Sequence, residues 1–406
     1  MPPRDAVVAV ALLVIGAVIS VLRIPASLLN GLYAEDGEVF IWDWLWRPRW
    51  SLFFAPYAGY LHVLPRILSG LTVLLPVAWW GVATTVLACL TIGGVSAGVW
   101  LAARALELGR VVAAAVALVP VLAPMAAVEA LGNLCNLHWY CLYLLTWVCC
   151  AGRRLTHPFV WAVVVLLSCL TEIQALILLP FVAITWWRRR VAWPIVAAWL
   201  IGTASQLVCY LTAQRPRAPG HPSILGTVAG YLGNVVLGGF GERAALSRSL
   251  SLVRLGFAGL LFVAFVALAI TVLWRSSQRW LGLFLLALSG ALWVVAMWSN
   301  NSLDFGRMLV LFRWGTTASM VFTAGVAIVL SEVRWRSWIR ISVAVVLVLL
   351  ILRGFYADNS VRQGRAPDWP VALEASSGTC TTTSRTTDVT IWPDGWFVRL
   401  SCARVR

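Results

Sequence analysis

Long apolar stretches recur along most of this 406-residue chain, and they limit its fold more than any other feature. They follow one another from near the N-terminus to about position 353, each close to the length of about 20 residues that a helix needs to cross a bilayer. Hydrophobic residues make up 61% of the chain and charged residues only 12%, which excludes an ordinary soluble domain. Because helices satisfy their own backbone hydrogen bonds in lipid, the sequence predicts an all-α polytopic membrane protein.

Arginines between the apolar stretches predict how the chain crosses the membrane. They cluster at the ends of the stretches, and the positive-inside rule places such clusters on the cytoplasmic side. Starting from a cytoplasmic Arg4, we expect about eleven crossings of a plasma membrane. Nucleic acid is not an expected partner, since these arginines would meet anionic headgroups of membrane lipids. The expected spans are 6–25, 79–103, 111–128, 137–152, two short arms within 158–187, 191–212, 252–274, 280–298, 312–331 and 337–353.

The stretch 158–187 is too short for two full crossings, and the arginines at both of its ends do not fit a single crossing. Arginines lie on both sides of it, at 153–154 and at 188–190. A single long helix would put the two clusters on opposite faces of the membrane, whereas two full crossings would need about 40 residues. We therefore predict a short hairpin whose tip, Thr171 to Gln174, lies below the outer surface of the membrane.

The expected membrane domain covers residues 1–353. Two parts of the chain differ from its simple series of spans. The first extracytoplasmic loop, 26–78, contains an amphipathic stretch interrupted by prolines, which predicts helices lying along the membrane interface. The tail 354–406 has strand-like runs of Thr and Val around a Pro-Asp-Gly turn, which predicts an extracytoplasmic β-hairpin. We expect Cys380 and Cys402 to close it as a disulfide in an oxidising compartment. The other cysteines show no metal-ligand spacing.

The first loop gathers four acidic residues within nine positions of a chain that has few acids elsewhere: Glu35, Asp36, Glu38 and Asp43. One interpretation is a solvated turn. The alternative is a functional site, because the acids lie among Trp, Phe, Tyr and Ile side chains that would hold them at a fixed depth. A partly desolvated carboxylate beside another has the raised proton affinity of a general base. Asp36 is the first candidate for that base, and Glu35 is the second.

Polar residues at other outward-facing ends of the spans are candidates for binding a substrate. Each also has a structural interpretation, as a helix cap, an interfacial side chain or a member of a structural ion pair. An arginine near the outer leaflet is suited to a lipid-linked phosphate. The candidates are Glu38, His62, Arg66, Asn133, Asn136, His138, Glu172, Gln174, Asp304, Arg307 and Arg313, with Glu129 close to the asparagines.

The acidic pair Glu35-Asp36 in the first loop, followed by interfacial helices and alternating spans, resembles the GT-C class of integral-membrane glycosyltransferases. The resemblance implies a polyprenyl-phosphate sugar donor and a glycolipid or polysaccharide acceptor. It implies that Asp36 or Glu35 deprotonates the acceptor hydroxyl, and that Arg307 and Arg313 stabilise the departing phosphate. The Asp-Leu-x-Val-Tyr type motif of the mannose-dependent branch is absent, so the donor sugar, a pentose such as arabinofuranose or a hexose such as mannose, stays open.

No nucleotide cofactor is implied, because the sequence has no Walker loop and no dinucleotide fingerprint. The outer acids are compatible with a divalent metal, Mg²⁺ or Mn²⁺, shared with the phosphate. Two other functions stay open. A transporter or flippase of lipid-linked sugars would also bury polar groups, although no internal repeat is evident. A polymerase of lipid-linked oligosaccharides would use arginines in outer loops, as at 215, 217, 243 and 248.

Overall fold

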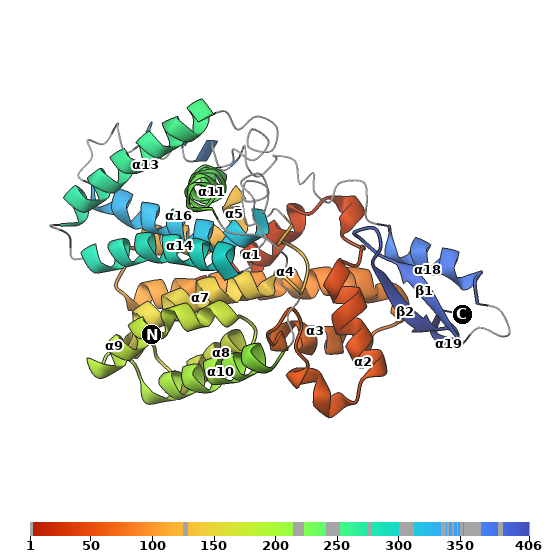
Figure 1. The fold of residues 1–406 in the computed structure, drawn as a ribbon. Helices are drawn as coiled ribbons and strands as arrows, with labels where there is room; N and C mark the ends of the chain where they lie inside the picture. The colour runs from red at the N-terminus through yellow and green to blue at the C-terminus, as the bar shows by residue number, and fades with distance from the viewer. Residues whose placement is uncertain are drawn as a thin grey trace.

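A computed structural model describes residues 3–124, 129–213, 223–240, 252–274, 276, 278–299, 312–333, 367–380 and 385–405, with isolated residues between 338 and 352. It is mostly helical and carries one two-stranded antiparallel hairpin near the C-terminus (Figure 1). Five helices in the described residues are long and apolar enough to cross a membrane, which makes this a multi-pass membrane protein. They are α1 (Pro3–Leu22), Val77–Ala105, α10 (Trp193–Thr212), α14 (Arg279–Ser299) and Arg313–Glu332.

Other expected spans form helices of unequal length. The helix α13 (Leu252–Leu273) has 22 residues, close to the expected bounds. By contrast, α5 (Arg110–Leu122) has 13 residues and α7 (Leu137–Ala151) has 15, so neither reaches the length of a full crossing. The structure therefore supports a multi-pass bundle, while the number of full crossings among the described residues is lower than expected. About half of the residues of the expected span 337–353 lie outside them.

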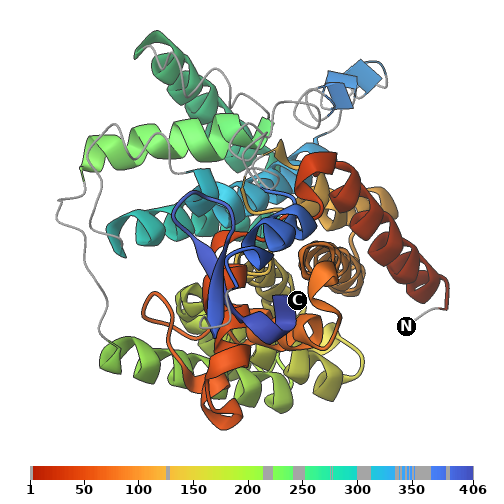
Figure 2. The same ribbon diagram turned by 90° about the vertical axis from the view of Figure 1, so that its right-hand side faces the viewer.

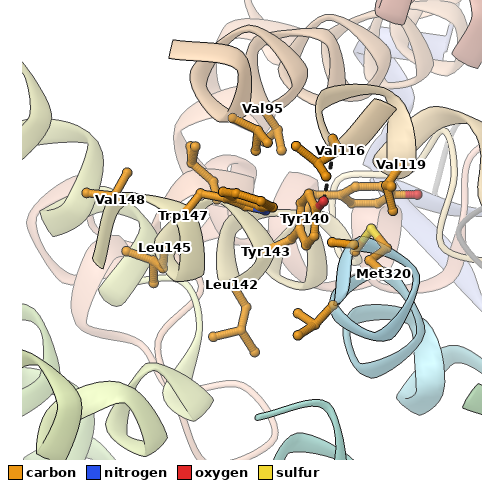
Figure 3. Close-up of a cluster of buried hydrophobic side chains, with 14 of the residues drawn as sticks. Val95, Val116, Val119, Tyr140, Leu142, Tyr143, Leu145, Trp147, Val148 and Met320 are labelled. Carbon is orange, nitrogen blue, oxygen red and sulfur yellow. Dashed lines mark hydrogen bonds between the residues drawn. The ribbon is translucent and has the colours of Figure 1, made fainter. Parts of the chain in front are cut away.

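The short helix α7 is the centre of the bundle, and its composition explains why. All but one of its residues are buried, including the large rings of Tyr143 and Trp147. Figure 3 shows Tyr143 and Trp147 packed between valines of the neighbouring helices and Met320 of α16 (Thr316–Glu332). The Tyr143 hydroxyl donates a hydrogen bond of 2.8 Å to the carbonyl of Val116 in α5. A helix that is apolar all round is enclosed by other helices, so it does not need to match the thickness of the bilayer.

Small residues let α1 cross α4 (Trp80–Ala105) at close range. A Cβ atom placed on Gly93 would lie 2.2 Å from the carbonyl oxygen of Leu13, and one on Gly16 would lie 3.1 Å from the Cα of Gly93. Close backbone approach through small residues is a common way for helices to associate in membranes, where burial of apolar surface gives little advantage.

The structure confirms the short hairpin predicted at 158–187. The chain forms α8 (Pro158–Cys169), turns through Glu172, and returns as η6 (Ile173–Leu178) and α9 (Leu179–Trp187). The two arginine clusters meet at one end, where the backbone N–H of Arg153 donates to the carbonyl of Arg190 at 2.6 Å. The tip therefore lies inside the protein, at the other end of these helices.

The first loop and the nearby connections form several short helical segments. In the loop, a π-helical turn η2 (Asp36–Ile41) leads into α2 (Trp42–Trp46), and the interfacial helix expected later in the loop is α3 (Val63–Val73). The remaining segments are η1 (Ala26–Leu28), η3 (Arg49–Phe54), η4 (Val77–Trp79), η5 (Gly152–Arg154), α11 (Ile224–Gly230), η7 (Tyr231–Leu237), η8 (Gly238–Phe240) and η9 (Phe312–Gly315).

The tail folds as predicted around its cysteines. It comprises α18 (Trp369–Ser377), β1 (Thr386–Thr390), β2 (Phe397–Ser401) and α19 (Cys402–Val405). A disulfide joins Cys380 to Cys402, and β1 pairs antiparallel with β2. Alternate side chains of both strands are buried against the first loop and Trp80, and Figure 2 shows the hairpin at this end of the bundle.

Candidate functional site

Several of the predicted polar residues line one cavity of 390 Å³. Its wall joins the first loop, the segment before α7, the tip of the 158–187 hairpin, α10, α14 and η9, so it is built from parts of the chain far apart in sequence. The predicted residues in this wall are Glu35, His62, Asn136, His138, Glu172, Gln174 and Arg313. Residues that the sequence did not single out include Tyr57, Tyr60, Cys135, Trp139, Tyr210 and Trp314.

Glu35 offers a carboxylate to this cavity. It is 8% exposed, and its Oε1 accepts a hydrogen bond of 3.2 Å from the Tyr57 hydroxyl. Its Oε2 is buried and has no hydrogen-bond partner among the described residues. Burial, together with the charge of Glu35, raises the pKa of Tyr57, so the phenol keeps its proton and acts as a donor.

The neighbouring Asp36 has a different environment. Its Oδ2 and Oδ1 each accept a hydrogen bond of 2.8 Å, from the backbone N–H groups of Leu134 and Cys135 respectively. Asp36 is 1% exposed and is not part of the cavity wall. Two charge-assisted hydrogen bonds from the backbone hold this carboxylate in place. Asp36 thus ties the first loop to the segment before α7.

Arg313 brings a positive charge to the same wall. Its Nη1 donates at 3.0 Å to Oε1 of Glu129, and the Tyr33 hydroxyl donates to the same oxygen at 2.7 Å. Glu129 has a left-handed backbone with φ of 63°, a conformation that costs on the order of 1 kcal/mol in a residue other than glycine. Burial and the charge of Glu129 raise the pKa of Tyr33 above its usual value. The predicted Asp304 and Arg307 lie outside the described residues.

A histidine and a glutamate form a buried pair in the cavity wall. Nδ1 of His138 is hydrogen-bonded to Oε2 of Glu172, while Oε1 of Glu172 accepts from the backbone N–H of Gln174 at 2.7 Å. Both oxygens of Glu172 are therefore held, and the residue is 1% exposed, as its place at the buried hairpin tip predicts. A carboxylate on one ring nitrogen fixes the orientation of the imidazole, which leaves Nε2 as the nitrogen available to a ligand.

His62 adds a second imidazole to the wall. Its ring lies against Tyr60, with centroids 4.2 Å apart, and 5.9 Å from the ring of His138. Nε2 of His62 is buried without a hydrogen-bond partner in the described part of the chain. Burial, with smaller effects of His138 and Arg66, holds the pKa of His62 well below its usual value, so this ring is neutral.

Three other predicted residues lie outside the cavity wall. Arg66 is buried and pairs with Asp43, and its Nη2 donates to the carbonyl of Ala55 at 2.9 Å. Glu38 accepts a hydrogen bond of 3.1 Å from the backbone of Phe397 in the tail. Asn133 donates to the carbonyl of Glu129 at 2.7 Å. These contacts hold the loops together and do not reach the cavity.

The remainder of the wall is apolar. It includes Leu176 and Ile177 of η6, Leu207 of α10 and Val295 of α14. Leu207 is 43% exposed and Val295 39%, and both belong to candidate membrane spans. The cavity thus joins a polar region to exposed apolar side chains of two candidate spans.

Comparison with known proteins adds nothing to this description. No family model, curated protein or solved structure matches the chain. The described residues also contain no group of three or more His, Cys, Asp or Glu side chains placed to hold a metal ion.

Proposed function

We propose that this protein is a membrane glycosyltransferase of the GT-C type. It would transfer a sugar from a polyprenyl-phosphate donor to a glycolipid or polysaccharide acceptor on the extracytoplasmic side. The observation that carries the proposal is the composition of one cavity wall, which joins Glu35, Arg313 and the His138–Glu172 pair to apolar side chains of two candidate spans. An amphiphile with an anionic, hydroxylated head and a long apolar chain has the matching chemistry.

The polar side chains of the cavity wall have the chemistry that such a transfer requires. Glu35 would accept the proton of the acceptor hydroxyl, whose oxygen forms a bond to the anomeric carbon as the bond from that carbon to the phosphate oxygen breaks. The polyprenyl phosphate leaves with the bonding electrons, and the configuration inverts. Arg313 would stabilise its negative charge. His138, Asn136 and Gln174 would bind sugar hydroxyls, with Glu172 orienting the ring of His138.

The disulfide supports an extracytoplasmic site. Disulfides persist in oxidising compartments, and the tail that contains this one packs directly on the first loop, which carries Glu35. The arginines at 153–154 and 188–190 lie at the other end of the hairpin whose tip reaches the cavity, as expected if that end is cytoplasmic.

Substitution of Glu35 by Gln tests the proposal. The purified variant in lipid nanodiscs should lose transfer from a polyprenyl-phosphate sugar by about 10² to 10⁴-fold, the usual contribution of a general base, while its melting temperature stays close to that of the wild type. The matched control is Glu107→Gln. It removes an exposed acid that pairs with Arg154 and does not line the cavity, so it should leave transfer unchanged.

Two results would contradict the assignment. Full turnover by Glu35→Gln would remove this residue from the reaction. Movement of a lipid-linked sugar across the bilayer of reconstituted vesicles, with no glycosidic bond formed, would identify a transporter instead.

A further inference from the structure

The C-terminal hairpin is joined directly to the loop that carries Glu35. The backbone N–H of Ala34 donates to the carbonyl of Trp392 at 2.6 Å, and the N–H of Trp392 donates to the carbonyl of Leu32 at 3.3 Å. Tyr33 and Trp392 thereby form a parallel β-bridge, although more than 350 positions separate them in the sequence. The residue directly before Glu35 is therefore fixed by the tail.

Side chains extend this connection to the positive group of the cavity. The rings of Tyr33 and Trp392 lie in contact, with centroids 5.5 Å apart. The hydroxyl of Tyr33 shares one oxygen of Glu129 with Arg313. A displacement of Trp392 would consequently reach Arg313 through two intervening side chains, and it would reach Glu35 through the backbone.

The loop is also shaped to receive the hairpin. A Cβ atom on Gly37 would lie 2.6 Å from both Ile391 and Val398, so only a glycine allows the hairpin to approach this closely. Glu38 accepts a hydrogen bond from the backbone of Phe397, which gives a half-buried acid of the first loop a partner in the tail. The tail therefore packs closely against the loop that carries Glu35.

We propose that the disulfide-closed hairpin is a clamp that positions Glu35 and Arg313 for substrate, with Trp392 as its positioning residue. The substrate named here rests on the function proposed above, whereas the mechanical connection does not. Trp392 touches no reacting atom in this account. It acts through Tyr33 and through the backbone of the first loop.

The clamp can be tested by hydrogen–deuterium exchange on the full chain in nanodiscs, with and without reduction of Cys380–Cys402. Reduction should speed amide exchange in 31–41 by at least about fivefold, the effect of losing one net backbone hydrogen bond, and leave exchange in α7 unchanged. Trp392→Ala should act in the same way with the disulfide intact, and Trp392→Phe should restore protection because it keeps a ring against Tyr33. The control is Asp388→Asn, on an exposed edge of the same hairpin.

Binding of decaprenyl phosphate, measured on the same samples, connects the clamp to the cavity. Reduction and Trp392→Ala should each weaken binding by about tenfold, and Trp392→Phe should restore most of it. Faster exchange in the tail with unchanged exchange in 31–41 would overturn the clamp. Unchanged decaprenyl phosphate affinity despite faster exchange in 31–41 would overturn its positioning role. A wild-type protein that binds no decaprenyl phosphate would contradict the proposed function, while the exchange data would still decide whether the clamp exists.

Discussion

Two adjacent acids in the first loop have different structural environments. The carboxylate of Asp36 is held by backbone N–H groups of Leu134 and Cys135, whereas Glu35 lines the cavity and has one oxygen without a partner in the described residues. The sequence suggested that one of this pair is a base, and Asp36 was the first candidate. The contacts favour Glu35 for that role, because a base must reach a substrate hydroxyl. Which acid accepts the proton stays a prediction.

Replacing His62 by Gln should reduce the dependence of stability on pH. Because burial lowers the pKa of His62, the unfolded chain binds a proton near pH 6.5 that the folded protein does not bind. Stability should therefore fall as the pH drops below about 6.5, by at most about 1.4 kcal/mol per pH unit from this residue, until the pH reaches the folded-state pKa.

Thermal unfolding in detergent at about pH 7.5 and about pH 5.5 measures this effect. The wild type should lose more stability between the two conditions than His62→Gln. Equal losses would show that His62 is protonated in the folded protein as readily as in the unfolded chain. The comparison isolates His62 because His138 and Glu172 are present in both proteins.

At the scale of elements, adjacent glycines in α4 provide a matched test of helix packing. A Cβ on Gly93 would collide with the backbone of α1, whereas one on Gly94 would meet nothing within 4 Å. Gly93→Ala should therefore lower the free energy of unfolding by about 1–3 kcal/mol, the usual cost of overpacking. Gly94→Ala should be neutral or slightly stabilising, because alanine favours a helix more than glycine does.

The midpoint of unfolding in denaturant, followed by tryptophan fluorescence, compares the two variants. Equal midpoints for Gly93→Ala and Gly94→Ala would mean that α1 and α4 do not approach as closely as the structure places them. The pair also separates packing from intrinsic helix preference, since both substitutions make the same chemical change one position apart.

The hairpin at 158–187 shows what charge and length can predict about an element. Arginines on both sides and too few residues for two crossings required a turn inside the membrane domain, and the structure places Glu172 there. The length of α7 was less predictable. Its apolar composition suits both a lipid-facing span and a buried central helix, and only the packing of the other helices around it distinguishes the two.

For the whole molecule, the sequence predicted a polytopic helical protein, the disulfide and many of the residues that meet in the cavity. It did not predict their pairing. Arg313 pairs with Glu129, 184 positions away in the sequence, and no local pattern indicates such a contact. Tyr57 and Tyr60 were missed because aromatic residues in an interfacial loop are typical of membrane anchoring. Long-range packing, which periodicity does not encode, determines these contacts.

The central claim is that the cavity holds a lipid-linked sugar phosphate, and native mass spectrometry of the protein purified in mild detergent tests it most directly. The account predicts a bound polyprenyl phosphate or its sugar ester, whose affinity falls by about 10- to 100-fold in Arg313→Gln and is largely kept in Arg313→Lys, since a charged hydrogen bond contributes about 1.5–3 kcal/mol. Copurification of ordinary phospholipids alone, bound equally by the wild type and both variants, would contradict it.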